Sequence, residues 1–141
     1  IILAAGESRR MGVQNKLLLQ IDSEVLIRKF VKSVSNSLVD AVLVVVGFEA
    51  EKIKAVLHDQ SVKFVENPSY EEGMTTSIQS GVKASSNEST GLMICLADMP
   101  FAETSDLNHL IQVFYKIWPV KLEPLVLRGS AGISLQHIVL G

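Results

Sequence analysis

The sequence predicts an α/β fold, a three-layer sandwich with a mostly parallel β-sheet between two layers of helices. Four short runs rich in β-branched and aliphatic residues carry the first part of this prediction. They are apolar on both faces, a pattern that a strand needs only when helices cover both of its sides. Segments with helical periodicity separate these runs, and such alternation is typical of parallel sheets with right-handed crossovers. The predicted strands are residues 1–4, 41–46, 62–65 and 91–97.

The helical segments between these strands differ in clarity. In the first, at residues 26–38, apolar side chains such as Leu26, Phe30 and Val34 recur on one face. Arg28 and Lys32 fall on the other face, as expected of a helix that covers a sheet. Weaker patterns predict helices at residues 49–57, 74–84 and 107–117. In a fold of this class the ligand crevice is expected at the carboxyl ends of the strands.

Length and composition indicate a single globular domain over residues 1–141. Hydrophobic residues make up 48% of the chain and charged residues 20%, which is too apolar for a disordered chain and too often interrupted by charge for a membrane span. The net charge of −2 provides no overall basic field that would hold nucleic acid. We expect no nucleic-acid partner, no membrane and a cytoplasmic protein; the oligomeric state is not predicted.

The sulfur-containing residues fit this interpretation. Cys95 is the single cysteine and lies in the fourth predicted strand, so we expect a buried structural thiol and no intrachain disulfide. Met74, Met93 and Met99 fit core packing.

The end of the chain departs from the alternation of strands and helices. Residues 118–141 are apolar with few charges and show no clear period, and Pro119 and Pro124 interrupt them. The chain also opens on Ile1 rather than on methionine. We expect that the sequence is not the whole gene product, and that residues 118–141 are either truncated or joined from non-contiguous pieces.

The loop after the first strand has the parts that a polyphosphate needs. Ala4, Ala5 and Gly6 are small enough to let backbone N–H groups approach phosphate oxygens, and Gly6 can take a positive φ at a sharp turn. Arg10 and Lys16 add cations at the end of a buried strand. A solvated basic loop is the alternative. A Walker-type P-loop and the dinucleotide fingerprint are both excluded by the glycine spacing.

The run over residues 3–19, Leu-Ala-Ala-Gly-x-Ser-x-Arg-Met-Gly-x-x-Asn-Lys-Leu-Leu-Leu, resembles the signature of the MobA-like nucleotidyltransferases. Within that family it is most similar to the molybdenum cofactor cytidylyltransferase branch. The resemblance implies a Rossmann-like fold of the nucleotide-diphosphosugar transferase type, and a loop that wraps a nucleoside triphosphate. The Ala-Ala-Gly form resembles enzymes that use CTP more than those that use GTP. The nucleotide-binding residues implied in this loop are Leu3, Ala4, Ala5, Gly6, Arg10 and Lys16.

A second candidate element follows the third strand, at residues 67–78. Gly73 can serve the turn, and Thr75, Thr76 and Ser77 place hydroxyl groups beside the unpaired N–H groups of a helix N-terminus, which favours an anion. Ordinary N-capping by serine or threonine is the alternative. The stretch resembles the Gly-Met-x-x-Ser element of the same family, which implies a contact with the nucleotide or the acceptor. Ser77 is the preferred residue.

A third element, Leu96-Ala97-Asp98-Met99-Pro100, closes the fourth strand. A lone aspartate after a strand is often only a turn former. Here the stretch resembles the Leu-Ala-Asp-Met-Pro element of the family, whose aspartate binds magnesium. Asp98 is therefore the candidate ligand for Mg²⁺, which takes oxygen ligands and keeps several waters.

Together these elements predict nucleotidyl transfer, in which an acceptor phosphate attacks the α-phosphorus of a nucleoside triphosphate and pyrophosphate leaves. Arg10, Lys16 and Asp98 are the candidate catalytic residues, because positioning and charge neutralisation lower such a barrier. The resemblance implies a molybdopterin acceptor. A transferase acting on a sugar phosphate or another small phosphate, and an inactive nucleotide-binding module, are the alternatives. The resemblance is good to about Tyr115 and poor beyond it.

Overall fold

The computed structural model describes residues 1–7 and 15–117. Its central sheet has the strand order β5-β4-β1-β6, and every neighbouring pair is parallel. These strands are β1 (Ile2–Ala4), β4 (Leu43–Val46), β5 (Lys63–Glu66) and β6 (Cys95–Leu96). The helices are α1 (Leu26–Ser35), α2 (Ala50–Val56), α3 (Met74–Ala84) and α4 (Thr104–Ile117). The predicted α/β fold with a mostly parallel sheet is confirmed.

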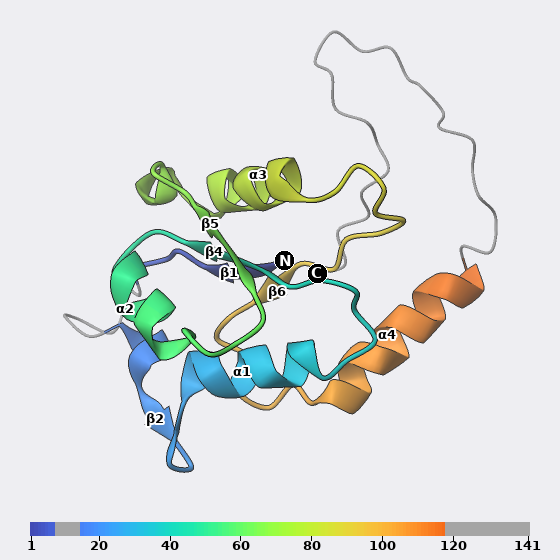
Figure 1. The fold of residues 1–141 in the computed structure, drawn as a ribbon, viewed down its shortest axis with the longest axis horizontal. Helices are drawn as coiled ribbons and strands as arrows, with labels where there is room; N and C mark the ends of the chain where they lie inside the picture. Colours follow the sequence, from blue (N-terminus) through green and yellow to red (C-terminus); the bar gives the residue numbers. More distant parts are fainter. Residues whose placement is uncertain (8–14, 118–141) are drawn as a thin grey trace, which may run out of the picture.

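The helices form two layers on opposite faces of the sheet. Helix α3 lies along one face, and α1 and α4 lie along the other (Figure 1). Because successive side chains of a strand point to opposite faces, β1 divides its residues between the two layers. Leu3 belongs to the cluster on the α3 side, together with Ala5 and Val45, whereas Ile2 and Ala4 belong to the larger cluster on the α1 side.

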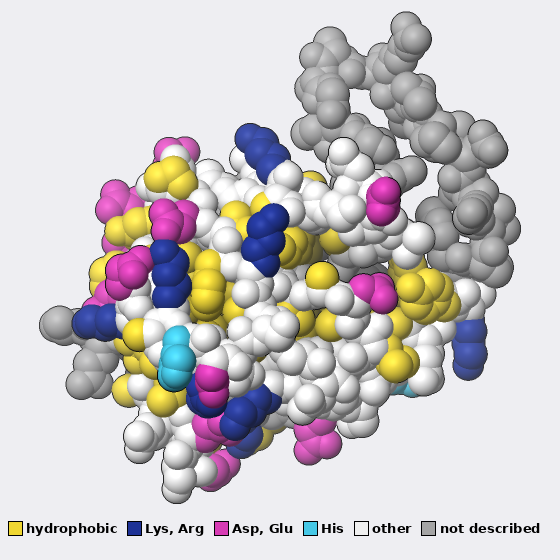
Figure 2. Space-filling model, viewed as in Figure 1, with side chains coloured by type: hydrophobic (Ala, Val, Ile, Leu, Met, Phe, Trp, Pro, Cys, Tyr) yellow, Lys and Arg dark blue, Asp and Glu magenta, His cyan; other side chains and the backbone are white. Residues whose placement is uncertain are grey.

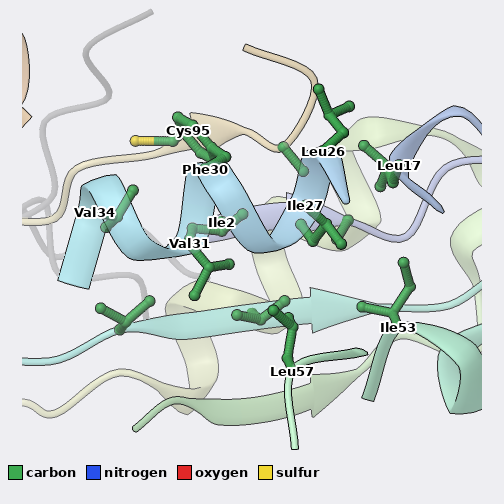
Figure 3. Close-up of a cluster of buried hydrophobic side chains, with 14 of the residues drawn as sticks. Ile2, Leu17, Leu26, Ile27, Phe30, Val31, Val34, Ile53, Leu57 and Cys95 are labelled. Atoms are coloured by element: carbon green, nitrogen blue, oxygen red, sulfur yellow. The ribbon is translucent and has the colours of Figure 1, made fainter. Parts of the chain in front are cut away.

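Helix α1 supplies much of the larger core. Its apolar side chains Leu26, Phe30 and Val34 are buried as predicted. The helix ends at Ser35, however, and Leu38, which the prediction placed on the same stripe, is exposed. Figure 3 shows side chains of this helix together with residues of the strands and of α2. Phe30 and Ile27 are almost completely excluded from solvent, and each fully buried side chain of this kind stabilises the fold by about 1.5–3 kcal/mol.

A small hairpin precedes α1 and was not predicted. Strands β2 (Gln20–Ile21) and β3 (Glu24–Val25) pair antiparallel. Asp22 and Ser23 form their turn with φ of 52° and 70°, a left-handed conformation that aspartate adopts at the first position but that usually calls for glycine at the second. The sequence therefore carries no strong turn signal here. Two short 3-10 helices, η2 (Lys16–Leu18) and η3 (Tyr70–Glu72), complete the described elements.

The predicted boundaries also differ from the observed ones. The fourth predicted strand, residues 91–97, contains only the two residues of β6. Its one neighbour among the described strands, β1, is three residues long, so β1 offers few partners for the ladder hydrogen bonds of a longer strand. Cys95 is buried as expected. Met74 and Met99 are exposed, at 57% and 43% of their surface, so the prediction that they pack in the core is wrong.

The strand order contains a topological switch point. From β1 the chain adds β4 and then β5 in one direction, and then places β6 on the opposite side of β1. In open α/β sheets the crossovers diverge at such a point, which leaves a crevice at the carboxyl ends of the two central strands. The crevice expected here lies after β1 and β6, where the first and third sequence elements are found.

The surface carries both signs of charge. On the face shown in Figure 2, acidic and basic side chains are interspersed, with hydrophobic side chains between them. Within residues 1–7 and 15–117, no helix has the length and apolar character needed to cross a membrane.

Candidate active site

A cavity of about 270 Å³ lies at the carboxyl ends of the strands. It is lined by residues from all three sequence elements, although these elements are far apart in the chain. The first contributes the residues after β1, the second the start of α3, and the third the residues after β6. The predicted site residues that line it are Leu3, Ala5, Gly6, Lys16, Ser77 and Asp98.

Lys16 and Asp98 face each other at this cavity. Lys16 Nζ lies 2.5 Å from Asp98 Oδ2, and the two residues are 82 positions apart in the sequence. Their side chains are 38% and 37% exposed, so a ligand can reach both. An ion pair with this exposure contributes little to stability, about 0–1 kcal/mol. A triphosphate and a metal ion could therefore replace the pair's mutual contact at small cost.

Lys16 is held in place by the short helix η2, which it begins. Asn15 is buried and caps η2, and its Oδ1 accepts a hydrogen bond from Leu17 N at 3.1 Å. Leu17 is itself buried in the core. The backbone that carries Lys16 is thus fixed on both sides, while the ammonium group remains accessible.

The predicted residues of β1 and its following loop do not all reach the cavity. Leu3 and Ala5 line it. The Ala4 side chain is buried in the core on the opposite face, so only the backbone of Ala4 could serve a ligand there. A Cβ placed on Gly6 would meet no atom of the described residues within 4 Å. Arg10 lies outside the described residues.

Gly6, which could take a positive φ at a sharp turn, does not have one in the structure. Among the described glycines only Gly73 has a positive φ, at 112°. Gly73 is the N-cap of α3, and no side chain caps this end of the helix. The N-capping interpretation of residues 75–77 is therefore wrong, because the hydroxyls of Thr76 and Ser77 are used differently.

These hydroxyls belong to a small network behind the cavity wall. Asn67 Nδ2 donates to Thr76 Oγ1 and to Ser77 Oγ, both at 2.9 Å. Ser77 is 5% exposed and lines the cavity. Its place on the first turn of α3 and its hydrogen bond with the buried Asn67 hold the hydroxyl at the cavity wall.

Several wall residues were not selected from the sequence. Tyr70, Met74 and Leu96 line the cavity, and Asn67 supports it from behind. An aromatic residue close to a glycine-initiated helix was a signal for Tyr70, and a polar residue directly after a strand was a signal for Asn67. Neither pattern separates a site residue from a loop residue without the fold.

A second cavity, of about 350 Å³, lies elsewhere on the molecule. It is mainly apolar and is bounded by Val34 of α1, Phe114 of α4 and Met93. Of the predicted site residues that the structure describes, none lines this cavity. This cavity is larger than the one at the switch point, but it is not the candidate active site. Burial beside this cavity raises the pKa of the Cys95 thiol, which keeps it protonated and unreactive.

Lys16 and Asp98 thus face each other at the switch point of a parallel sheet, which is where open α/β proteins bind their ligands. The family model of the MobA-like NTP transferase domain matches residues 1–125. The chain belongs to this family.

Several curated proteins are similar in sequence to this chain. The chain is 39% identical over 121 residues to the purine catabolism protein PucB of Bacillus subtilis, covering 79% of this chain and 58% of PucB. It is 28% identical over 134 residues to the molybdenum cofactor cytidylyltransferase of Escherichia coli, covering 94% of this chain and 64% of that protein. It is 26% identical over 116 residues to a probable molybdenum cofactor guanylyltransferase of Methanosarcina acetivorans, covering 79% of this chain and 51% of that protein.

Solved structures show the same fold. A nucleotidyl transferase from Methanothermobacter thermautotroptrophicus has a TM-score of 0.67 at 24% identity, with 79% of this chain and 55% of that chain covered. Rv0371c from Mycobacterium tuberculosis has a TM-score of 0.70 at 23% identity, with 79% and 57% covered. The fold is thus of the nucleotide-diphosphosugar transferase type. The chain spans about half the length of the first curated relatives it matches.

Proposed function

We propose that this chain carries the nucleotide site of a nucleotidyltransferase. The enzyme would transfer a nucleoside monophosphate from a nucleoside triphosphate to a phosphate-bearing acceptor and release pyrophosphate. Membership of the MobA-like family supports the reaction class. The observation that carries the proposal is the meeting of Lys16 and Asp98 at the switch-point cavity, because it provides a cation for phosphate oxygens beside a carboxylate for a metal ion.

The donor set fits Mg²⁺ as the metal. Within the described part of the chain, no group of three or more histidine, cysteine, aspartate or glutamate side chains could hold an ion by itself. Asp98 lines the cavity as a single carboxylate. That set suits an ion that takes one or two protein carboxylates and completes its shell with water and substrate phosphates. When bound, Mg²⁺ would neutralise charge on the phosphate oxygens.

The protein's own residues would then act mainly by positioning. Lys16 would leave its contact with Asp98 and stabilise the negative charge that develops on the leaving pyrophosphate. Arg10 would add a second cation, and the backbone around Gly6 would lie against the phosphates. The acceptor phosphate would attack the α-phosphorus in line, so that the new P–O bond forms as the bond to the β-phosphate oxygen breaks. Ser77 would contact the nucleotide from the opposite wall.

The finer assignment is CTP as the nucleotide and molybdopterin as the acceptor, in the cytoplasm. The Ala-Ala-Gly form of residues 4–6 supports CTP, and one relative is a molybdenum cofactor cytidylyltransferase. Guanylyltransferases also occur among the relatives, as does the bifunctional protein GlmU. GTP and other small-phosphate acceptors are thus the specific competitors to be tested.

The direct test measures thermal stability and pyrophosphate release in the same preparation. A ligand that binds only the folded state raises the unfolding temperature, so CTP with Mg²⁺ should raise it more than GTP, ATP or UTP do. Pyrophosphate release should then require a molybdopterin acceptor. A rise in the unfolding temperature without release of pyrophosphate on any phosphate acceptor would indicate a nucleotide-binding module without activity. No shift with any of the four nucleotides would contradict the proposal.

A further inference from the structure

Asn67 stands directly behind the cavity wall. It follows β5, and its backbone N–H donates to Val46 O at 2.8 Å, which extends the pairing between β5 and β4 by one residue. Its side chain is buried, with 3% of the residue exposed. Asn67 is not among the residues that line the cavity. Any effect on a ligand must therefore pass through a neighbour.

The orientation of the Asn67 carboxamide is fixed by one unambiguous partner. The backbone N–H of Ser69 can only donate, and it lies 3.0 Å from Asn67 Oδ1. The oxygen must therefore face Ser69, and the NH₂ group must face the two hydroxyls on α3. Both N–H hydrogens are used, because Thr76 Oγ1 and Ser77 Oγ each lie 2.9 Å from Nδ2. The amide group has no freedom to turn.

This orientation makes Ser77 a hydrogen-bond acceptor toward Asn67. A hydroxyl has one hydrogen and two lone pairs, so the Ser77 O–H remains available as a donor. Thr76 Oγ1 lies 2.9 Å from two backbone carbonyls, Ser69 O and Gly73 O. Ser77 has no such acceptor among the described residues, and it lines the cavity.

We propose that Asn67 is a positioning residue that forces the Ser77 hydroxyl to donate into the cavity, toward an acceptor oxygen or nitrogen of the bound nucleoside triphosphate. The proposal rests on the nucleotide binding proposed above and extends it to a residue that does not touch the ligand. Its structural basis is a pair of hydrogen bonds whose directions are fixed. Ser69 N–H donates to Asn67 Oδ1, and Asn67 Nδ2 therefore donates to Ser77 Oγ.

The test is a substitution that keeps the shape and reverses the hydrogen bond. In Asn67→Asp the carboxylate can still accept from Ser69 N–H, but it cannot donate. The Ser77 hydroxyl would then donate to the carboxylate instead of the nucleotide. We expect Asn67→Asp to raise the dissociation constant for CTP with Mg²⁺, measured by titration calorimetry, roughly tenfold, about the loss of one hydrogen bond. Ser77→Ala should have a similar effect.

A double-mutant cycle separates this mechanism from simple charge repulsion. If Asn67 acts through Ser77, the double variant should bind CTP no more weakly than Ser77→Ala alone. If the new negative charge acts directly on the triphosphate, the two effects should add. Ser80→Ala is the matched control, because Ser80 lies one turn further along α3 and its hydroxyl bonds Thr76 O outside the cavity. The dissociation constant of the Ser80→Ala variant for CTP should stay within about twofold of that of the parent protein.

Thermal unfolding without nucleotide shows whether each variant is folded. If Asn67→Asp does not fold, Asn67→Ala enters the same cycle, because it removes the orienting donor without adding charge. Additive effects in the cycle, or unchanged binding by a folded Asn67 variant, would overturn the role of Asn67 while leaving nucleotide binding intact. Absence of CTP binding by the parent protein would instead refute the proposed function, and the role of Asn67 with it.

Discussion

The ring of Tyr70 packs directly on the backbone of Gly47. A Cβ added to Gly47 would lie 2.7 Å from both Cβ and Cγ of Tyr70, which is closer than carbon atoms approach. Gly47 follows β4, and Tyr70 lines the cavity from η3. The position of Tyr70 in the cavity wall therefore depends on the absence of a side chain at Gly47, which does not itself line the cavity.

Gly47→Ala should move Tyr70 and disturb the cavity. The clash involves the part of Tyr70 nearest its backbone, so a change of rotamer cannot relieve it. We expect a loss of about 1–3 kcal/mol in the free energy of unfolding, as in other overpacked sites, and weaker binding of CTP. Urea denaturation and calorimetry would measure the two effects. Full stability with unchanged binding would show that η3 moves freely.

Gly6→Ala should separate stability from function. A Cβ at Gly6 meets no atom of residues 1–7 or 15–117 within 4 Å, and Gly6 does not have a positive φ, so the free energy of unfolding should change by less than about 0.5 kcal/mol. The added methyl group would occupy space proposed for the triphosphate. The affinity of Gly6→Ala for CTP should therefore fall, while its midpoint of urea denaturation stays unchanged. An affinity equal to that of the parent protein would mean that the phosphates do not bind beside Gly6.

Lys16→Ala and Asp98→Ala should each lower the rate of pyrophosphate release by roughly a hundredfold or more, because each removes charge stabilisation of the transition state. Both variants should remain as stable as the parent protein to within about 1 kcal/mol, since the pair is exposed. Lys29→Ala is the control, because Lys29 forms a comparable ion pair with Asp22 and does not line the cavity. Turnover at the parental rate in either test variant would remove that residue from the mechanism.

The sequence predicted which segments form the site but not how they meet. The carboxyl ends of parallel strands share one edge of a sheet, so Lys16 and Asp98 were both expected near that edge. Their direct contact depends on β6 lying beside β1, and strand order is not encoded in hydrophobic periodicity. The roles of these residues, and that of Arg10, stay predictions.

The wall behind the site was less accessible to sequence reasoning. The side chain of Asn67 bonds to Ser77 on α3, and Tyr70 packs on Gly47 after β4, so each depends on a partner that is distant in the sequence. The hairpin turn at Asp22 and Ser23 was missed for a local reason, because Ser23 occupies the second left-handed position, where glycine is usual. Local patterns identify single elements, whereas these features depend on which elements pack together.

Phe30→Ala tests the larger core. Phe30 is 2% exposed on the buried face of α1, and removal of its ring would leave a cavity among tightly packed neighbours. We expect a loss of about 3–5 kcal/mol in the free energy of unfolding, measured by urea denaturation. Lys32→Ala on the exposed face of the same helix should change it by less than about 1 kcal/mol. A small effect of Phe30→Ala would mean that the core collapses around the space.

The Arg28–Asp59 ion pair should make stability depend on acid pH. Arg28 Nη1 and Nη2 donate to the two carboxylate oxygens of Asp59 at 2.6 and 2.5 Å, and these hydrogen bonds hold the pKa of Asp59 well below its ordinary value of 3.8. A carboxyl whose pKa is lower in the folded state contributes stability above the unfolded pKa, and that contribution is lost as the pH falls through the folded pKa.

Asp59→Asn should therefore be less stable than the parent protein at pH 7. The difference between the two, followed by urea denaturation, should shrink steadily below about pH 4, the ordinary range of an aspartate. A difference that is constant from pH 7 to pH 2 would show that Arg28 is held by its other contact, the hydrogen bond from Nη1 to Val56 O, and not by the charge on Asp59.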